Sequence, residues 1–82
     1  MFYLYILQSQ KDKGFYIGIS TDPQKRLSEH NKGKTKSTKP RIPFIIIYQK
    51  EFKKRIDPRK REIELKNNYQ KRKELLTKLG FL

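Results

Sequence analysis

The chain has 82 residues and a mass of 10.0 kDa, which leaves room for one domain with a modest hydrophobic core and excludes two separate functional domains. It carries 21 Lys and Arg against 8 Asp and Glu, so its formal net charge is +13 and a polyanionic partner, most simply nucleic acid, is expected. Binding to an anionic membrane surface would require a long amphipathic helix or an apolar anchor, and the sequence contains neither. The absence of cysteine excludes disulfides, thiolate nucleophiles and cysteine-bound metal centres.

The N-terminal segment predicts a β-hairpin. Residues 2–9 and 15–20 are rich in aromatic and branched side chains and are typical of two antiparallel strands, joined by a turn at 11–14. The apolar run at the very start is short and has no basic residues before it, so it is neither a signal peptide nor a membrane-spanning helix. We therefore expect a cytoplasmic protein.

A helix is expected after the hairpin. Asp22 can cap free backbone amides, and Pro23 suits the first helical position. Gly33 is expected to end this helix. A polar, basic loop follows over residues 32–41.

The C-terminal half predicts one more strand and a long helical tract. Residues 44–48, Phe-Ile-Ile-Ile-Tyr, are short and strongly β-prone, which indicates a central strand covered on both faces. Asp57 and Pro58 repeat the capping signal and open a helical tract to about Leu79, with a possible break near residues 70–72. The tract has an apolar stripe that is expected to face the sheet, formed by Leu65, Tyr69, Leu76 and Leu79.

The resulting order β-β-α-β-α-α predicts an α+β fold for residues 1–82 as a single domain. Its sheet is small, three-stranded and mainly antiparallel, and it is flanked by helices.

Several chemically useful residues recur at informative places in this order. The first strand contains Tyr3-Leu4-Tyr5, the second contains Tyr16-Ile17-Gly18, Arg26 follows on the next helix and Glu62 on a later one. In this order and spacing the chain resembles the GIY-YIG nuclease superfamily from about residue 2 to residue 76, and most of all its small single-domain bacterial members of the UPF0213 type. The resemblance implies that fold and an endonuclease activity. One departure is Tyr3, which stands where the name-giving pattern has Gly and which concerns only backbone packing.

Two tyrosines are candidates for general-base work. Hydrolysis of a phosphodiester needs an activated water, neutralisation of charge on the phosphate and help for the leaving oxygen. Tyr5 and Tyr16 lie on adjacent strands, and a phenol beside a metal-bound water can accept its proton if nearby positive charge favours the phenolate. The alternative interpretation is that both are ordinary half-buried strand aromatics.

Arg26 and His30 share one helix face because they are four residues apart. Arg26 can hold a phosphate oxygen through its planar guanidinium, although most arginines in so basic a chain are solvated surface residues. Some members of the resembled family carry a catalytic His or Lys at the position of His30, where an imidazole could relay a proton. The alternative is a His that interacts with the last carbonyls of its helix.

Glu62 is the candidate metal ligand. One carboxylate is enough for Mg²⁺ or Mn²⁺, because such an ion keeps several waters and takes further ligands from the substrate phosphate. The alternative is a simple helix pair with Lys66. Many members of the family have an Asn about twelve residues after this Glu, and this chain has Glu74 there.

Two basic stretches are candidates for binding the nucleic acid backbone. No acid lies between Glu29 and Glu51, and Thr35, Ser37 and Thr38 add hydroxyl groups that could bind phosphates. A solvated charged face is the alternative. The basic candidates are Lys32, Lys34, Lys36, Lys39, Arg41, Lys53, Lys54, Arg59, Lys60 and Arg61.

Three hypotheses follow from the sequence. The first is an endonuclease that cuts DNA, with single-stranded or branched DNA favoured, using one divalent metal and the residues Tyr5, Tyr16, Arg26, His30 and Glu62. The second is a non-catalytic basic nucleic-acid-binding module, and the third is a structural ribosome-associated protein. We expect a monomer or weak oligomer with no membrane partner and no small-molecule cofactor.

Overall fold

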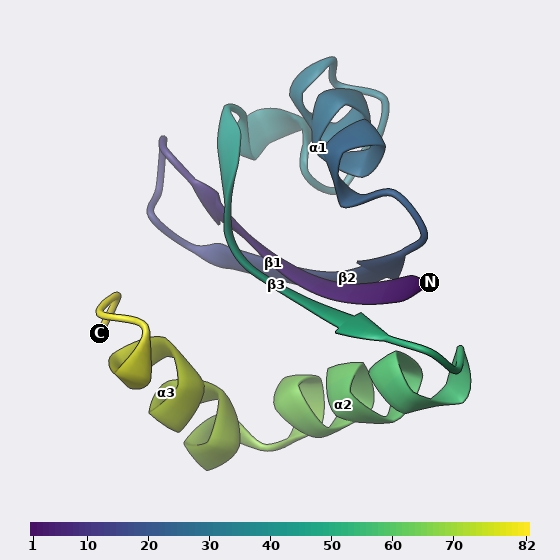
Figure 1. The fold of residues 1–82 in the computed structure, drawn as a ribbon. Helices are drawn as coiled ribbons and strands as arrows, with labels where there is room; N and C mark the ends of the chain where they lie inside the picture. The colour runs from purple at the N-terminus through teal and green to yellow at the C-terminus, as the bar shows by residue number, and fades with distance from the viewer.

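The computed structural model describes all 82 residues and shows one three-stranded antiparallel sheet with helices on both faces (Figure 1). The expected α+β class and the order β-β-α-β-α-α are confirmed. In chain order the elements are β1 (Phe2–Ser9), β2 (Phe15–Ser20), α1 (Pro23–Asn31), a 3-10 turn (Lys39–Arg41), β3 (Phe44–Phe52), α2 (Ile56–Asn67) and α3 (Tyr69–Lys78).

Strand β1 is the centre of the sheet, between β2 and β3. All four residues of Leu4–Leu7 are buried, because successive side chains of a strand point to opposite faces and both faces are covered here. The prediction of a central strand at 44–48 was therefore wrong: β3 is an edge strand that runs on to Phe52, and its Ile45 is 45% exposed. A short apolar run indicates a strand, but it carries no information about the strand's place in the sheet.

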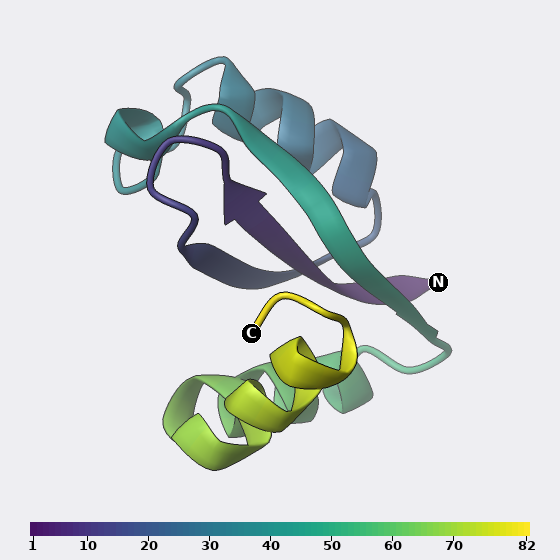
Figure 2. The ribbon, with the colours of Figure 1, turned by 90° about the vertical axis from the view of Figure 1, so that its left-hand side faces the viewer.

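Each face of the sheet has its own hydrophobic core. On one face Tyr5 and Leu7 of β1 pack with Phe44 and with Leu27 of α1. On the other face the buried cluster is Leu4, Ile6, Ile17, Leu65 and Leu76, which joins the sheet to α2 and α3. Figures 1 and 2 show this layering, with α1 on one side of the sheet and α2 and α3 together on the other.

Helix α1 begins and ends as its sequence predicts. The side chain of Asp22 accepts a hydrogen bond from the backbone amide of Lys25 at 3.1 Å, and Pro23 takes the first helical position. Gly33 lies just beyond the helix with φ of 76°, a left-handed conformation that glycine adopts without steric cost. This well-defined start fixes where the side chains of the helix point.

The start of α2 differs from the prediction. The helix begins at Ile56, so Asp57 lies inside the first turn, and no side chain caps the helix at Arg55. Asp57 still contributes favourably there, because a negative charge near a helix N-terminus interacts with the helix dipole.

The helical tract breaks at Asn68, earlier than residues 70–72. The Asn68 side chain accepts a hydrogen bond from the backbone amide of Lys71 at 3.1 Å and so caps α3. Because the helix restarts there, the expected apolar stripe does not continue across the break. Leu65 and Leu76 are buried, whereas Tyr69 is 64% exposed.

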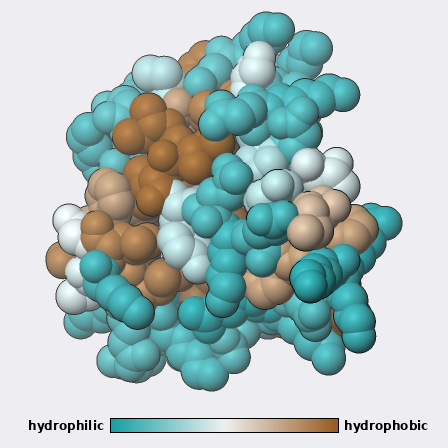
Figure 3. All heavy atoms as spheres, in the orientation of Figure 1, coloured by the Kyte–Doolittle hydropathy of each residue, from teal (hydrophilic) through white to brown (hydrophobic).

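The outer surface is mostly hydrophilic, as the net charge requires. Figure 3 shows hydrophilic residues over most of this face, interrupted by hydrophobic areas that are largest on its left-hand side. None of the three α-helices combines the length and the apolar character that crossing a membrane needs.

Candidate active site

Tyr5 lies directly across Gly18 of the neighbouring strand. The pairing of β1 with β2 places Tyr5 opposite Gly18 and Leu7 opposite Tyr16. A Cβ atom at position 18 would lie only 2.6 Å from the hydroxyl oxygen of Tyr5 and 2.8 Å from its Cζ atom, so only glycine leaves space for the ring. The missing side chain of Gly18 therefore provides the space that the phenol ring of Tyr5 occupies.

The two tyrosine rings lie on the same face of the sheet, the face covered by α1. Their centroids are 6.5 Å apart, which confirms the expectation that the hairpin brings them together. Their exposure differs. Tyr5 is only 1% exposed, whereas Tyr16 is half-buried and borders an open hollow of about 330 Å³ together with Phe15, Lys66 and Arg72.

Arg26 comes from the second turn of α1 and its guanidinium faces the hydroxyl of Tyr5. Burial raises the pKa of Tyr5, and the hydrogen bond and charge of Arg26 oppose this rise without cancelling it. The same contact with Tyr5 raises the pKa of Arg26. Arg26 also donates to Glu29 at 3.0 Å, and its side chain remains 36% exposed, so part of the guanidinium stays open to a ligand.

His30 lies below the surface, against Tyr16. Its residue exposure is 0%, its ring centroid is 4.8 Å from that of Tyr16, and the two rings meet edge to face. Its Nδ1 atom forms a hydrogen bond of 2.8 Å with the hydroxyl of Thr38, and that hydroxyl also lies 3.3 Å from the Thr35 carbonyl oxygen, so Thr38 ties the ring to the loop after α1. Burial, followed by the charge of Arg26, lowers the pKa of His30 and keeps the ring neutral at pH 7.

The surroundings of His30 and Thr38 differ from those expected from the sequence. Nε2 of His30 is buried and has no hydrogen-bond partner, and the ring bonds Thr38 rather than a helix carbonyl, so the helix-end interpretation of His30 is wrong. Thr38 is 1% exposed, so it holds the imidazole and is not open to a phosphate. Sequence reasoning missed this pair because the two residues are separated by a loop that has no periodic pattern.

Glu62 is the one buried carboxylate of the chain. Its side chain is 8% exposed, and it accepts from Arg59 at 3.3 Å and from Lys66 at 3.2 Å. Lys66 also lies over the ring of Tyr16, with its Nζ atom 5.9 Å from the ring centroid. Lys66 therefore connects Glu62 on α2 with the tyrosine pair, a role for which the sequence signal was only its position four residues after Glu62.

The structure thus brings Tyr5, Tyr16, Arg26 and His30 into direct contact, and Glu62 is close enough for its charge to act on Tyr5. No three His, Asp, Glu or Cys side chains gather into a metal cluster. A single buried carboxylate among cations does fit one hard divalent ion that takes the rest of its ligands from water and phosphate.

The predicted phosphate-binding residues have different surroundings. Lys32, Lys34, Lys36, Lys53, Lys54 and Lys60 are exposed and form no ion pair. Arg41 instead pairs with Asp12 at 2.8 Å and lies over the Phe44 ring. Arg61 pairs with Glu64.

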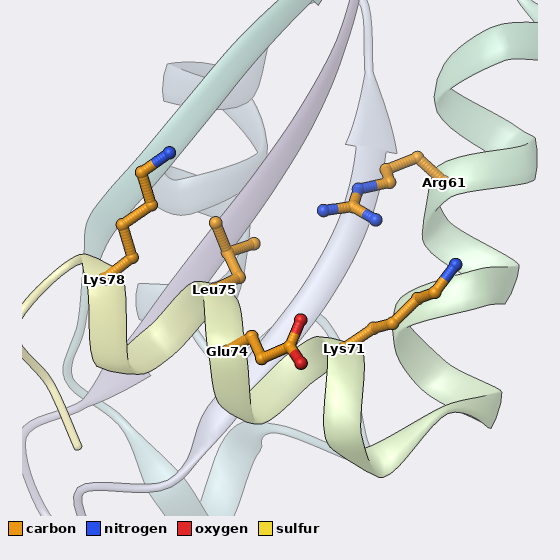
Figure 4. Close-up of a pocket in the computed structure, with 5 residues that line it drawn as sticks. All are labelled: Arg61, Lys71, Glu74, Leu75 and Lys78. Atoms are coloured by element: carbon orange, nitrogen blue, oxygen red, sulfur yellow. The ribbon is translucent and has the colours of Figure 1, made fainter.

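Glu74, at the place of the family's frequent Asn, faces a separate hollow between α2 and α3. Figure 4 shows its carboxylate in this hollow, which measures about 290 Å³ and is also lined by Arg61, Lys71 and Lys78. Glu62 is not among the lining residues. Glu74 therefore belongs to a different surface from the tyrosine pair.

Comparison with known proteins agrees with this arrangement. Residues 1–75 match the family model of the GIY-YIG catalytic domain, which supports a nuclease. The chain is 38% identical over 65 residues to UPF0213 protein SH2523 of Staphylococcus haemolyticus, with 78% of each chain covered. It is 37% identical over 73 residues to a UPF0213 protein of Streptococcus pneumoniae, covering 88% of this chain and 73% of the relative. A UPF0213 protein of Enterococcus faecalis is 39% identical over 75 residues, covering 88% and 84%. No solved structure matches. With a family model spanning nearly its whole length and several relatives above one-third identity, the chain belongs to the GIY-YIG family.

Proposed function

We propose that the protein is an endonuclease that hydrolyses phosphodiester bonds in DNA with the help of one divalent ion. The observation that carries this proposal is the convergence of two phenols, one partly open guanidinium and one buried carboxylate at the edge strand β2. These groups can supply a proton acceptor, a phosphate ligand and a metal ligand, which are the three functions that phosphodiester hydrolysis needs.

Arg26 is proposed to bind a non-bridging oxygen of the scissile phosphate. Its guanidinium is fixed on one side by Glu29 and Tyr5, and the exposed part offers donors in a rigid plane. Because an arginine stays charged at every working pH, this contact neutralises charge on the phosphate throughout the reaction.

Tyr5 and Tyr16 are proposed to take the proton of the attacking water. Tyr16 borders the open hollow, while Tyr5 is in contact with Arg26. Since burial raises the pKa of Tyr5, its phenol is protonated in the ion-free protein, and additional positive charge at the site is required to favour its phenolate. His30 is too deeply buried to touch the substrate and is proposed to position the Tyr16 ring.

Glu62 would hold the divalent ion, Mg²⁺ or Mn²⁺, which supplies charge to stabilise the transition state and lowers the pKa of bound water. Arg59 and Lys66 keep the carboxylate in place at the edge of the site. The strong basic charge supports nucleic acid as substrate, and the protein is proposed to act in the cytoplasm as a monomer or weak oligomer.

The test compares Glu62→Gln with a matched control, Glu64→Gln. Both residues lie on α2 and each pairs with one Arg and one Lys, but Glu64 is half-buried and lies outside the tyrosine site. Purified proteins are incubated with single-stranded, duplex and branched DNA in Mg²⁺, Mn²⁺ or chelator, and DNA binding is measured on the same preparations.

Cleavage should collapse in Glu62→Gln, remain in Glu64→Gln and disappear with chelator, while DNA binding survives in both variants. Full cutting by Glu62→Gln would refute the metal assignment and leave the helix pair with Lys66 as the role of Glu62. A binding module without catalysis predicts DNA binding with no cleavage by any of the three proteins.

A further inference from the structure

A groove next to the proposed active site has the character of a nucleotide-binding site. Two adjoining hollows of about 260 and 380 Å³ share Ile19 and Arg55. The first is also bordered by Phe2, and the second by Ile56 and Arg59. The groove therefore has an apolar floor from β1, β2 and α2 and two guanidinium groups beside it.

The groove lies on one side of Glu62 along α2. At its other end, α2 brings Lys66 against Tyr16 and Ile17, near the start of β2, whereas Arg55, Ile56 and Arg59 lie against Ile19 near its end. Helix α2 thus runs antiparallel to β2, and Glu62 lies between the groove and the Tyr16 hollow. Arg59 belongs both to the groove and to the ion pair with Glu62 at 3.3 Å, so the groove begins one side chain away from the proposed metal ligand.

The groove combines an exposed apolar side chain with a cation that has no acidic partner. Ile56 is 53% exposed, although it stands in a strongly basic segment of a chain with net charge +13. Arg55 forms no ion pair with any acid, and Asp57, the nearest acid in sequence, borders a different hollow with Phe52 and Lys60. A ligand with an apolar part and a negative charge matches both features.

We propose that this groove binds one unpaired nucleotide adjacent to the scissile phosphate, with its base on Phe2, Ile19 and Ile56 and its phosphate on Arg55 and Arg59. Sequence-independent binding of single strands uses this combination of stacking surface and basic groove, because every base has a flat face. The inference rests on the proposed nuclease function and extends it, because a base held in this way must be unpaired. The substrate is therefore single-stranded DNA or the single-stranded part of a branched junction.

The experiment separates base binding from backbone binding without requiring cleavage. Affinities are measured by fluorescence anisotropy in chelator, for a labelled thymidine oligomer and for an abasic oligomer of the same length. Wild-type protein should bind the thymidine oligomer about tenfold more tightly, since one stacked base contributes about that factor. Ile56→Ser and Phe2→Ala should lose this preference while retaining affinity for the abasic chain.

Matched controls use residues outside the groove. Ile45→Ser changes another exposed isoleucine, on β3, and should keep the tenfold preference. Arg55→Gln should weaken binding of both oligomers, whereas Lys73→Gln, an exposed lysine on α3, should change affinity less. Melting temperatures identify variants that fail to fold, and Ile56→Ser keeps the test decisive if Phe2→Ala unfolds.

Equal affinity of wild-type protein for the two oligomers would overturn the proposed subsite, and so would a full preference in folded Ile56→Ser. Failure of the nuclease proposal looks different. A protein that shows the base preference but never cuts DNA has the subsite without the activity, while a protein that cuts DNA without any base preference has the activity without the subsite.

Discussion

Replacing Gly18 with alanine should damage the site through a single added methyl group. The new Cβ would lie 2.6 Å from the hydroxyl oxygen of Tyr5, 2.8 Å from its Cζ atom and 3.2 Å from its Cε1 atom. Carbon atoms pack best at about 3.5–4.0 Å, so the ring must retreat by roughly 1 Å. It has little space to do so, because Tyr5 is 1% exposed and packs with Leu7 and Phe44.

The size of the effect follows from this geometry. Overpacking a filled core costs about 1–3 kcal/mol of unfolding free energy. Without a clash, Gly18→Ala would instead raise the unfolding free energy by about 0.4–1 kcal/mol, because alanine restricts the unfolded chain. The sign of the change in unfolding free energy therefore tests the contact. A displacement of about 1 Å in a catalytic group lowers rates by about 10²-fold, and Tyr5 would move relative to Arg26.

The assay pairs urea unfolding with single-turnover cleavage at saturating DNA. A second substitution, Tyr5→Phe, removes the nearest clashing atom, so Gly18→Ala with Tyr5→Phe should recover part of the lost stability but no activity. The double-mutant cycle should give a coupling of about 0.5–3 kcal/mol in unfolding free energy. Wild-type stability and wild-type rate in Gly18→Ala would refute the claim that glycine is needed to admit the Tyr5 ring.

Three further expectations concern charge. Arg26→Lys should lose most cleavage activity while binding DNA nearly normally, because an ammonium cannot reproduce a planar two-donor contact; near-wild-type turnover would place Arg26 outside the site. His30 is the chain's one histidine, so NMR can follow its ring alone, and its pKa should lie below the ordinary 6.5 because burial disfavours the charged ring. Since the unfolded chain then binds the proton more readily, the contribution of His30 to the unfolding free energy should fall as pH drops below about 6.5 and stay level above it. An NMR pKa at or above 6.5 contradicts the buried position. DNA affinity should fall by about 0.7 to 0.9 decades per decade of salt for each phosphate neutralised, and affinity that stays flat would exclude backbone binding by the exposed lysines.

The sequence predicted best what local physical chemistry controls. The hairpin, the Asp22 cap and the glycine end of α1 all depend on residues within a few positions of one another, and each is confirmed. The meeting of Tyr5 with Tyr16 follows in the same way, because the hairpin turn sets the pairing of the two strands.

Features that depend on the order of strands were not predictable from local patterns. The β-prone segments at 2–9 and 44–52 look alike, and only the pairing of β1 with both neighbours makes it the central strand. The helix break had the same effect on Tyr69. Its spacing from Leu65 predicts burial on one continuous helix, but Asn68 ends α2 and caps α3, so the two residues do not share a helix face and Tyr69 is exposed.

Within the site, the supporting contacts are the part that sequence reasoning missed. The bond between His30 and Thr38 crosses an irregular loop, and the contact of Lys66 with Tyr16 joins a helix to a strand about fifty residues earlier in the chain. The spacing from Glu62 to Lys66 suggested only a helix pair. The fold also places Lys66 against the Tyr16 ring, so Lys66 contacts both Glu62 and the tyrosine pair.

The surroundings of Glu62 explain how a chain with net charge +13 can hold a buried carboxylate. A buried charge is costly unless it is paired, and Arg59 and Lys66 supply that pairing in the free protein. Both cations also border the proposed path of the nucleic acid, Arg59 at the groove and Lys66 at the Tyr16 hollow. A divalent ion held by Glu62, as proposed, would share the neutralisation of that carboxylate and would leave more of the donors of both side chains free for phosphates. Under this proposal the same two residues would stabilise the folded site without substrate and would bind DNA once the ion is present, so one acid among many cations would suit this chemistry.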